Sequence, residues 1–170
     1  YFGRLSRQKG LKTFIEACKL LPEIRFVVAG AGEMEDEFKG IDNIDYVGFK
    51  TGNELKSLVG EALFSICPSE WYENCSMSIL ESQMYGTPVI AANIGGNSEL
   101  INNDIDGLLF KPGNKKDLAE KIDYLYKDKN KINEFSEKCF SKVTKEFGLE
   151  TYYHKIIKLY ENLIRTKLLC

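Results

Sequence analysis

The sequence predicts an open, doubly wound α/β sheet whose strands run parallel. Short apolar runs, which suit strands buried on both faces, alternate along the chain with amphipathic stretches that suit helices. Glycine or proline follows several of these apolar runs directly, as expected where a strand ends in a turn. At 170 residues the chain is long enough for one domain and too short for two ordinary ones.

The first half of the chain contains the clearest strand. Residues 24–29 read Ile-Arg-Phe-Val-Val-Ala, which is apolar and β-branched, and Gly30 closes the run. Segment 11–21 carries Leu11, Phe14 and Cys18 at the spacing of one helical face. The other elements expected in this half are a strand end at 1–4, a short acidic helix at 33–38, a strand at 44–49, a helix at 53–60 and a strand at 63–67.

The second half is richer in helix. A helix at 77–85 is expected to end at Gly86, and a strand follows at 88–92. A short strand at 107–110 then precedes helices at 116–126, 131–146 and 149–168. Strands and helices that alternate at this spacing imply parallel strands joined by right-handed crossovers.

Glycines and polar residues are concentrated directly after the expected strands. In open α/β sheets ligands bind at the carboxyl ends of the strands, so any site is expected at this edge. The residues concerned are 3–4, 30–32, 48–50, 68–70 and 93–96.

Composition excludes several classes of protein. The net charge is −2, with acids and bases interspersed, so there is no basic stripe for a nucleic-acid partner. No apolar run approaches the ~20 residues that span a bilayer, and no signal peptide is visible. The five cysteines and the single histidine form no zinc-ligand pattern, and we expect mostly buried thiols in a reducing, cytoplasmic compartment. Because the chain opens inside a strand and without methionine, we expect it to be a fragment.

Two short motifs suggest ligands but have simpler interpretations. Gly30-Ala31-Gly32 follows a strand, yet the dinucleotide fingerprint needs a third glycine where Glu35 stands. Asp104 and Asp106 have a spacing that metal-dependent enzymes use, but they lie in an Asn-, Asp- and Gly-rich run typical of a turn. We therefore expect no dinucleotide cofactor and no metal.

The loop and helix that follow the 63–67 strand form the most informative segment. Ser76 is a plausible N-cap, so the first N–H groups of the next helix would face the strand ends and favour an anion there. Glu73 and Glu81 flank this helix start and could accept hydrogen bonds from hydroxyls on either side of the anion. The alternative is that Glu73 is a solvated loop residue and Glu81 a surface acid of the helix.

Two bases complement this helix start. Arg4 follows the first strand and Lys9 precedes the first helix, so both could meet a diphosphate from the opposite wall of the site. Arginine offers a planar bidentate fork and lysine a point charge. The alternative is that both are solvated surface residues.

Together these motifs resemble one family. Gly3-Arg4-Leu5 with Lys9-Gly10, the Glu73 and Glu81 pair, and the run from Gly86 to Ala91 are similar to the retaining glycosyltransferases of family 4, also called group 1 glycosyltransferases. Gly95-Gly96 with Glu99 and the run from Phe110 to Gly113 with Leu118-Ala119 extend the resemblance from residue 3 to about residue 125.

The resemblance implies one Rossmann-like half of a GT-B architecture. Residues 1–170 would be the carboxyl-terminal, donor-binding domain, and the amino-terminal acceptor domain would be absent. Arg4 and Lys9 would hold the diphosphate, Glu73 hydroxyls of the donor sugar and Glu81 those of the ribose. The backbone at Ser76, Met77, Ser78 and Ile79 would meet sugar and phosphate, and that at Gly48 and Phe49 the base.

The expected function is transfer of a sugar from a nucleotide diphosphate sugar to an acceptor glycan or lipid. The resemblance implies no cofactor and no metal, and the fragment alone is expected to be inactive. The family further suggests polysaccharide or glycolipid assembly in the cytoplasm at the inner face of the membrane. The alternatives are a non-catalytic nucleotide-sugar-binding module and a GT-B-type epimerase or phosphorylase. The loop reads Glu-Asn-Cys-Ser where many relatives have Glu-x-Phe-Gly, which leaves the donor sugar open, and nothing in the sequence identifies the base.

The terminal helical segment at 149–168 is apolar around more of its circumference than contact with one sheet requires. Its apolar residues include Tyr153, Ile157, Ile164 and Leu168 in addition to a normal stripe. One interpretation is that these extra residues pack against the helix at 131–146. The other is that they meet the absent domain, which predicts an exposed apolar patch in this chain.

Overall fold

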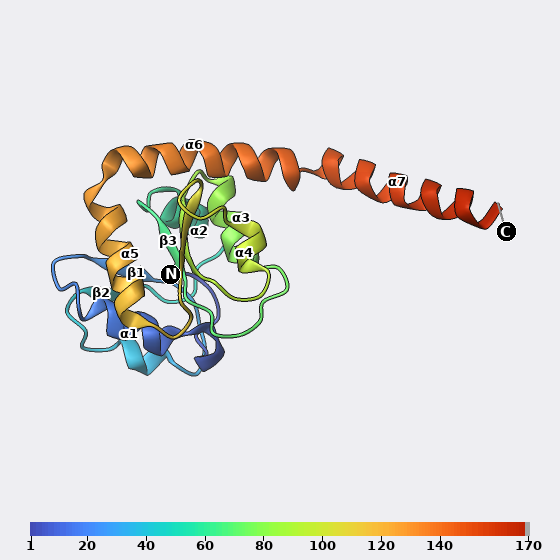
Figure 1. Cartoon of the computed structure of the whole chain (residues 1–170). Coiled ribbons are helices and arrows are strands. Elements are labelled where there is room, and N and C mark those ends of the chain that lie inside the picture. Colours follow the sequence, from blue (N-terminus) through green and yellow to red (C-terminus); the bar gives the residue numbers. More distant parts are fainter. Residues whose placement is uncertain (169–170) are drawn as a thin grey trace.

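Parallel strands in two adjacent groups carry the fold (Figure 1). The structure, a computed structural model, describes residues 1–168. Strand β1 (Phe26–Val28) pairs with β2 (Ile44–Tyr46) in the register Phe26–Ile44. Strand β4 (Val89–Ala92) lies between β3 (Ser65–Cys67) and β5 (Gly107–Phe110), and both of its pairings are parallel. The predicted parallel α/β fold is therefore confirmed.

The opening residues extend the first group of strands. Phe2 forms a parallel bridge with Ala29, whose N–H donates to the Tyr1 carbonyl at 2.9 Å. The Leu5 N–H then donates to the Ala31 carbonyl at 2.9 Å, so the segment at residues 1–5 stays hydrogen-bonded to the segment that follows β1. These contacts bring Gly3 and Arg4 to the same edge as the glycine-rich turn after β1, as the sequence predicts.

The helices lie where the sequence predicts them, with ends that differ by a few residues. Helix α1 ends at Cys18 rather than residue 21, because the N–H groups of Leu20 and Leu21 form tighter bonds to Ala17 and Cys18 carbonyls, just before Pro22. Two short elements were not expected, the 3₁₀ helix η1 (Arg7–Lys9) and the helix α4 (Asn97–Leu100). The remaining elements are α1 (Leu11–Cys18), η2 (Glu35–Phe38), α2 (Gly52–Gly60), α3 (Met77–Met84), α5 (Lys115–Lys127), α6 (Lys129–Glu146) and α7 (Leu149–Leu168).

The main core joins the strands to α1 and α5. Phe14 of α1 is fully buried and packs edge-on against Phe26 of β1, with ring centroids 5.9 Å apart. Leu118 and Ile122 of α5 are buried in the same cluster as Ile90 of β4. Burial of each such side chain stabilises the fold by about 1.5–3 kcal/mol. The strands therefore form a rigid base for the loops at their carboxyl ends.

The strands are shorter than the apolar runs that predict them. The run at 24–29 contains β1 over three residues, because Ala29 turns toward Tyr1 and Gly3, while the Gly30 N–H donates to the Gly48 carbonyl at 2.9 Å. Hydrogen bonding thus continues beyond the strand ends in an irregular form. The expected strand at 44–49 is reduced to Ile44–Tyr46: the Val47 N–H still donates to the Val28 carbonyl at 3.0 Å, and Gly48 then turns the chain with φ +73°.

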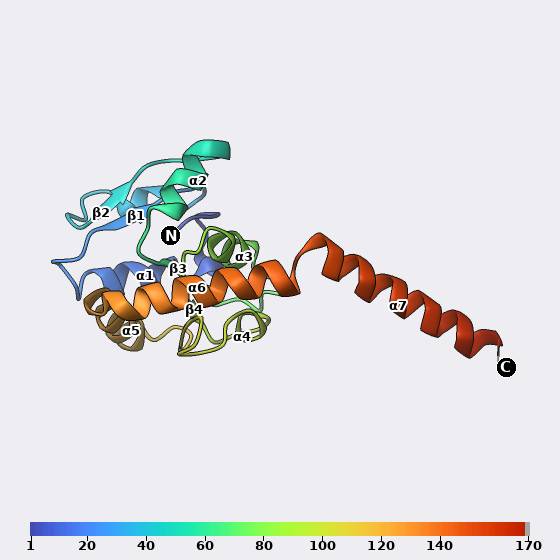
Figure 2. The same ribbon diagram turned by 90° about the horizontal axis from the view of Figure 1, so that it is seen from above.

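The last helix projects away from the rest of the domain. Figures 1 and 2 show α7 continuing outward from the end of α6, with no other element of the domain beside it. Tyr153, Ile157 and Ile164 are 57%, 36% and 59% exposed, so the interpretation that they pack against α6 is wrong. The predicted exposed patch is confirmed, and the Leu168 side chain lies outside the described residues. Within residues 1–168 no helix is long and apolar enough to cross a membrane.

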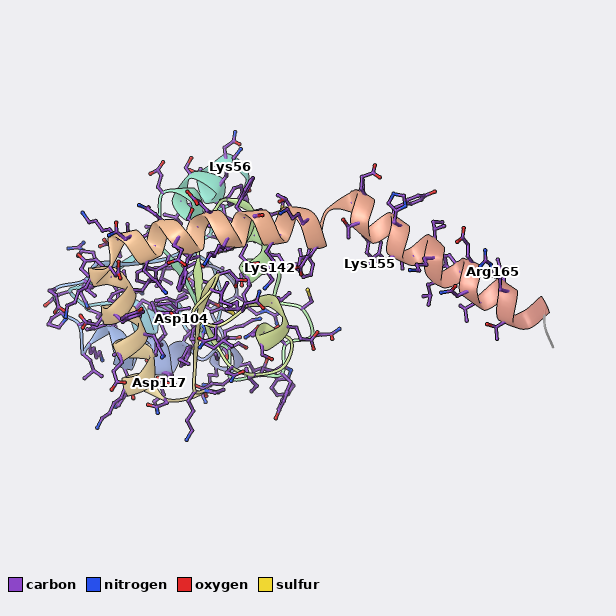
Figure 3. All side chains as sticks on the ribbon, turned by 45° about the horizontal axis from the view of Figure 1, so that its top comes forward. Lys56, Asp104, Asp117, Lys142, Lys155 and Arg165 are labelled. Carbon is purple, nitrogen blue, oxygen red and sulfur yellow. The ribbon has the colours of Figure 1, made fainter. Side chains whose placement is uncertain are left out.

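A buried polar network ties α6 to the rest of the domain. Lys142 of α6, labelled in Figure 3, forms an ion pair with Asp106 at 3.1 Å, and the two side chains are only 8% and 2% exposed. The Lys142 ammonium also donates to the Leu100 carbonyl at 2.8 Å, which accepts a second bond from Gln83 of α3. Asp106 accepts further bonds from the backbone and side chain of Asn102. Helices α3 and α6 are thus connected through one carbonyl.

Replacing Lys142 should therefore destabilise the domain. In Lys142→Met the Asp106 carboxylate stays buried without its cation, which should cost about 3–5 kcal/mol of unfolding free energy. Lys138→Met on the same helix removes an exposed pair with Glu134 and should have little effect. Urea unfolding of both variants measures the difference, and equal midpoints would show that the buried pair is not the anchor.

The exposed face of α7 should cause self-association of the 170-residue chain. Burying the face against a second copy removes its aromatic and aliphatic side chains from water. Sedimentation velocity should show a monomer that associates with increasing concentration, and Tyr153→Ser with Ile164→Ser should weaken this association. Lys158→Ser changes the polar face of the same helix and serves as the control. A wild-type chain that stays monomeric at the highest concentration would contradict the prediction.

Candidate functional site

Two adjoining pockets lie at the carboxyl ends of the strands, at the edge that the sequence predicts. The first, here the α3 pocket, has a volume of about 340 Å³. The second, here the β1 pocket, has a volume of about 370 Å³ and is lined by Ala29, Gly30, Ala31, Phe49, Lys50 and Leu55. Arg4 and Glu81 line both pockets. The α3 pocket is lined further by Lys9, Ser69, Glu73, Cys75, Ser76, Met77 and Ser78.

The start of α3 forms one wall of the α3 pocket. Ser76 takes the N-cap position with an extended backbone, but its hydroxyl makes no capping bond. It lies instead 3.4 Å from the Cys67 sulfur and 3.3 Å from the Ser78 hydroxyl. Burial raises the pKa of the Cys67 thiol, which therefore stays neutral beside the Ser76 hydroxyl. The first N–H groups of a helix lack partners within it and carry a positive partial charge, so this wall favours an anion.

An acid and a base meet across the α3 pocket. Lys9 and Glu73 form an ion pair through Glu73 Oε1, and their side chains are 29% and 18% exposed. The Ser69 hydroxyl donates to the same oxygen at 3.0 Å. Lys9 and Glu73 are separated by 64 positions in the chain, so their pairing depends on the contact between the two loops that carry them.

A close backbone contact joins those loops. Gly10 follows η1 with φ +67°, and a Cβ on it would lie 1.8 Å from the Pro68 carbonyl oxygen. Any larger residue would push apart the loops that carry Lys9 and Glu73. The Glu70 N–H donates to the Gln8 carbonyl at 3.0 Å, and the Thr13 hydroxyl donates to Glu70 at 2.5 Å. We refer to this contact between residues 8–10 and 68–70 as the loop seam.

Arg4 and Glu81 are available for a ligand. Both side chains are exposed and stand between the two pockets. Within residues 1–168 the Arg4 guanidinium forms no ion pair or hydrogen bond, so its five donors are free. Glu81 lies one turn into α3, on the side that both pockets share. The structure therefore brings Arg4, Lys9, Glu73 and Glu81 together, as the sequence predicts.

The remaining predicted residues divide into two groups. Met77 and Ser78 line the α3 pocket, and Phe49, 70% exposed, lines the β1 pocket. Ile79 is fully buried, and its N–H donates to the Ser76 carbonyl at 3.1 Å, so it lines neither pocket. Gly48 contributes a carbonyl to the Gly30 N–H rather than to a pocket wall.

Sequence reasoning placed Ser69 and Lys50 at the strand ends without giving either a role, and it missed Leu55. Ser69 follows β3 by two residues, so its position at the strand ends was visible in the sequence. Its bond to Glu73 was not visible, because that contact depends on how the loop turns. Lys50 lines the β1 pocket from the segment that leads into α2, and Leu55 lines it from α2 itself.

The two discounted motifs have structural roles. Asp104 lies in a turn with φ +64° and pairs with Lys131 at 3.3 Å, and Asp106 belongs to the buried network described above. Glu35 accepts a hydrogen bond from the Gly32 N–H at 2.9 Å, at the position where a dinucleotide site would need glycine. Within residues 1–168 no group of three or more His, Cys, Asp or Glu side chains is arranged to hold a metal.

Sequence comparison places these residues in a family. The family model of group 1 glycosyl transferases matches residues 1–141. The chain is 30% identical over 138 residues to the uncharacterized glycosyltransferase MJ1607 of Methanocaldococcus jannaschii, covering 75% of this chain and 35% of that protein. It is 30% identical over 181 residues to the UDP-Gal:alpha-D-GlcNAc-diphosphoundecaprenol alpha-1,3-galactosyltransferase of Escherichia coli, covering 97% of this chain and 45% of the relative. The chain thus spans less than half the length of these relatives.

Solved structures show the same fold. Anabaena Alr3699/HepE in complex with UDP matches with a TM-score of 0.85 at 24% identity, over 95% of this chain and 47% of that one. The C-terminal domain of a glycosyl transferase group 1 family protein, LpcC of Francisella tularensis, matches with a TM-score of 0.76 at 26% identity. That match covers 88% of this chain and 84% of the Francisella domain.

Proposed function

Because the chain belongs to the group 1 glycosyl transferases, we propose that it is the donor-binding domain of a retaining family 4 enzyme. The full enzyme would move a sugar from a nucleotide diphosphate sugar to an acceptor. The observation that carries the proposal is the meeting of Arg4, Lys9, Glu73 and Glu81 at two adjoining pockets. This set offers positive charge between two carboxylates, and a sugar–diphosphate–ribose ligand has the matching order of hydroxyls, charge and hydroxyls.

The positive groups would hold the diphosphate. Arg4 lines both pockets, Lys9 lines the α3 pocket, and the start of α3, whose first N–H groups favour an anion, lines the same pocket. During transfer, negative charge builds on the diphosphate as the bond to the sugar breaks. Donors already aimed at that charge stabilise it without reorganising, and this is the main contribution that the domain would make to catalysis. In this proposal no metal or cofactor is needed.

The two carboxylates would bind different parts of the donor. Glu73 lies on the loop side of the α3 pocket, away from the β1 pocket, and would accept hydrogen bonds from hydroxyls of the sugar. Glu81 lines both pockets and would accept bonds from the ribose. The β1 pocket, which the exposed Phe49 lines, would then hold the base. Anabaena Alr3699/HepE has been crystallised with UDP and with UDP-glucose, which supports these ligands as probes.

The wider proposal concerns the whole enzyme. The relatives are more than twice as long as the part that this chain matches, which supports a second domain that would bind the acceptor. The Escherichia coli relative acts on a diphosphoundecaprenol-linked sugar, and this supports a glycan or lipid acceptor. We extend the proposal to an enzyme that works in the cytoplasm at the inner face of the membrane. Without the acceptor domain, the 170-residue chain should bind a donor and transfer no sugar.

The separate roles of the glutamates can be tested by calorimetry with UDP and UDP-glucose. Glu81→Ala should weaken both ligands, because both contain the ribose. Glu73→Ala should weaken UDP-glucose alone. A hydrogen bond to a charged group contributes about 1.5–3 kcal/mol, so each loss should be roughly tenfold or more. Glu120→Ala, exposed on α5, is the control. If Glu73→Ala and Glu81→Ala weaken UDP equally, the assignment of roles is wrong.

A further inference from the structure

Glu73 is restrained through one of its two carboxylate oxygens. Lys9 and the Ser69 hydroxyl both donate to Oε1. Within residues 1–168, Oε2 accepts no hydrogen bond, although the Glu73 side chain is only 18% exposed. The second oxygen is therefore left for a ligand in the α3 pocket.

The Ser69 proton has several acceptors within reach, and the geometry selects one. The Ser69 oxygen lies 3.0 Å from Glu73 Oε1, 3.4 Å from the Gln8 carbonyl and 3.5 Å from the Trp71 carbonyl. A hydroxyl donates a single proton, and a carboxylate at the shortest distance is the strongest acceptor. The Trp71 N–H, 3.4 Å away, donates back to the same hydroxyl and holds it in place.

The backbone around Glu73 is fixed independently of Ser69. The Gly96 N–H donates to the Glu73 carbonyl at 2.7 Å. A Cβ on Gly96 would lie 2.2 Å from the Asn74 carbonyl oxygen, so the two loops touch at this point. The Glu73 backbone is thus held by contacts that do not involve Ser69, and within residues 1–168 Lys9 and Ser69 are the two residues that donate hydrogen bonds to its side chain.

These two restraints differ in one respect. Lys9 is partly exposed and reaches into the pocket from a long flexible side chain, whereas Ser69 is 1% exposed in the loop seam. In the proposed function Lys9 also binds the diphosphate, so its contact with Glu73 weakens when the donor arrives. Ser69 carries no charge to pair with the diphosphate, so its bond to Glu73 is not drawn away by the anion.

We propose that Ser69 is a positioning residue that holds Glu73 Oε1 while Lys9 binds the diphosphate, so that Oε2 faces a hydroxyl of the donor sugar. The inference rests on the proposed function. It adds a specificity-determining residue outside the four charged groups. It also explains why the acid and base of the pocket can form an ion pair before the donor binds without blocking the sugar.

The test compares Ser69→Ala with Thr13→Val. The Thr13 hydroxyl also donates to a glutamate across the loop seam, but it donates to Glu70 rather than Glu73. Each substitution removes one buried hydroxyl and nearly preserves shape. Calorimetry with UDP and UDP-glucose measures ligand preference, and crystal structures of the ligand-free variants give the position of Glu73 Oε1.

Ser69→Ala should keep UDP affinity within about twofold and lose about tenfold in UDP-glucose affinity, with Oε1 displaced from its position beside residue 69. Thr13→Val should match the wild type in both measurements. Unchanged UDP-glucose affinity in Ser69→Ala, or an equal loss in both variants, would overturn the proposal. If the wild type binds neither ligand, the proposed function fails for UDP donors. The crystal structures then decide the positioning role, because an undisplaced Oε1 in Ser69→Ala would overturn it.

Discussion

The backbone contact between Gly10 and Pro68 is the constraint on which the site depends. A Cβ on Gly10 would lie 1.8 Å from the Pro68 carbonyl oxygen, so the loop before α1 and the loop after β3 can meet only because residue 10 is glycine. The Gln8–Glu70 backbone bond continues the contact along the loop seam. As a result, Lys9 and Glu73, far apart in the chain, share one hydrogen-bonded cluster with Ser69. The absence of a side chain at Gly10 thus allows Glu73, Lys9 and Ser69 to meet near the start of α3.

The charged side chains at this edge of the sheet line the two pockets, and not all of them are paired within residues 1–168. Lys9 is neutralised by Glu73, while Arg4 is exposed and has no partner within residues 1–168. The first turn of α3 adds a positive partial charge that no acidic residue in that turn offsets. In the proposed function the diphosphate binds between Arg4 and α3, and Glu73 and Glu81 bind the hydroxyls at its two ends.

Much of this arrangement could be predicted from the sequence, and the rest depended on loop geometry. The rule that ligands bind at the carboxyl ends of parallel strands, together with the family resemblance, predicted that Arg4, Lys9, Glu73 and Glu81 lie at one edge. The bond from Ser69 to Glu73 could not be predicted, because it depends on the turn of residues 69–73. Likewise, Ser76 occupies the predicted cap position, but its hydroxyl bonds to Cys67 and Ser78 instead. The exposed face of α7 was one of two interpretations of its wide apolar circumference, whereas the buried Lys142–Asp106 pair carries no signal in the sequence.

The most direct test of the account is the affinity of Arg4→Ala for UDP, measured by calorimetry. Among the residues that line both pockets, Arg4 is the cation. Its loss should therefore weaken UDP binding by about 2–4 kcal/mol, which is ~30-fold or more in affinity. Arg25→Ala removes an exposed arginine that pairs with Asp45 outside both pockets and should leave the affinity unchanged. Unchanged UDP binding in Arg4→Ala, with the wild type binding normally, would contradict a diphosphate site at this edge of the sheet.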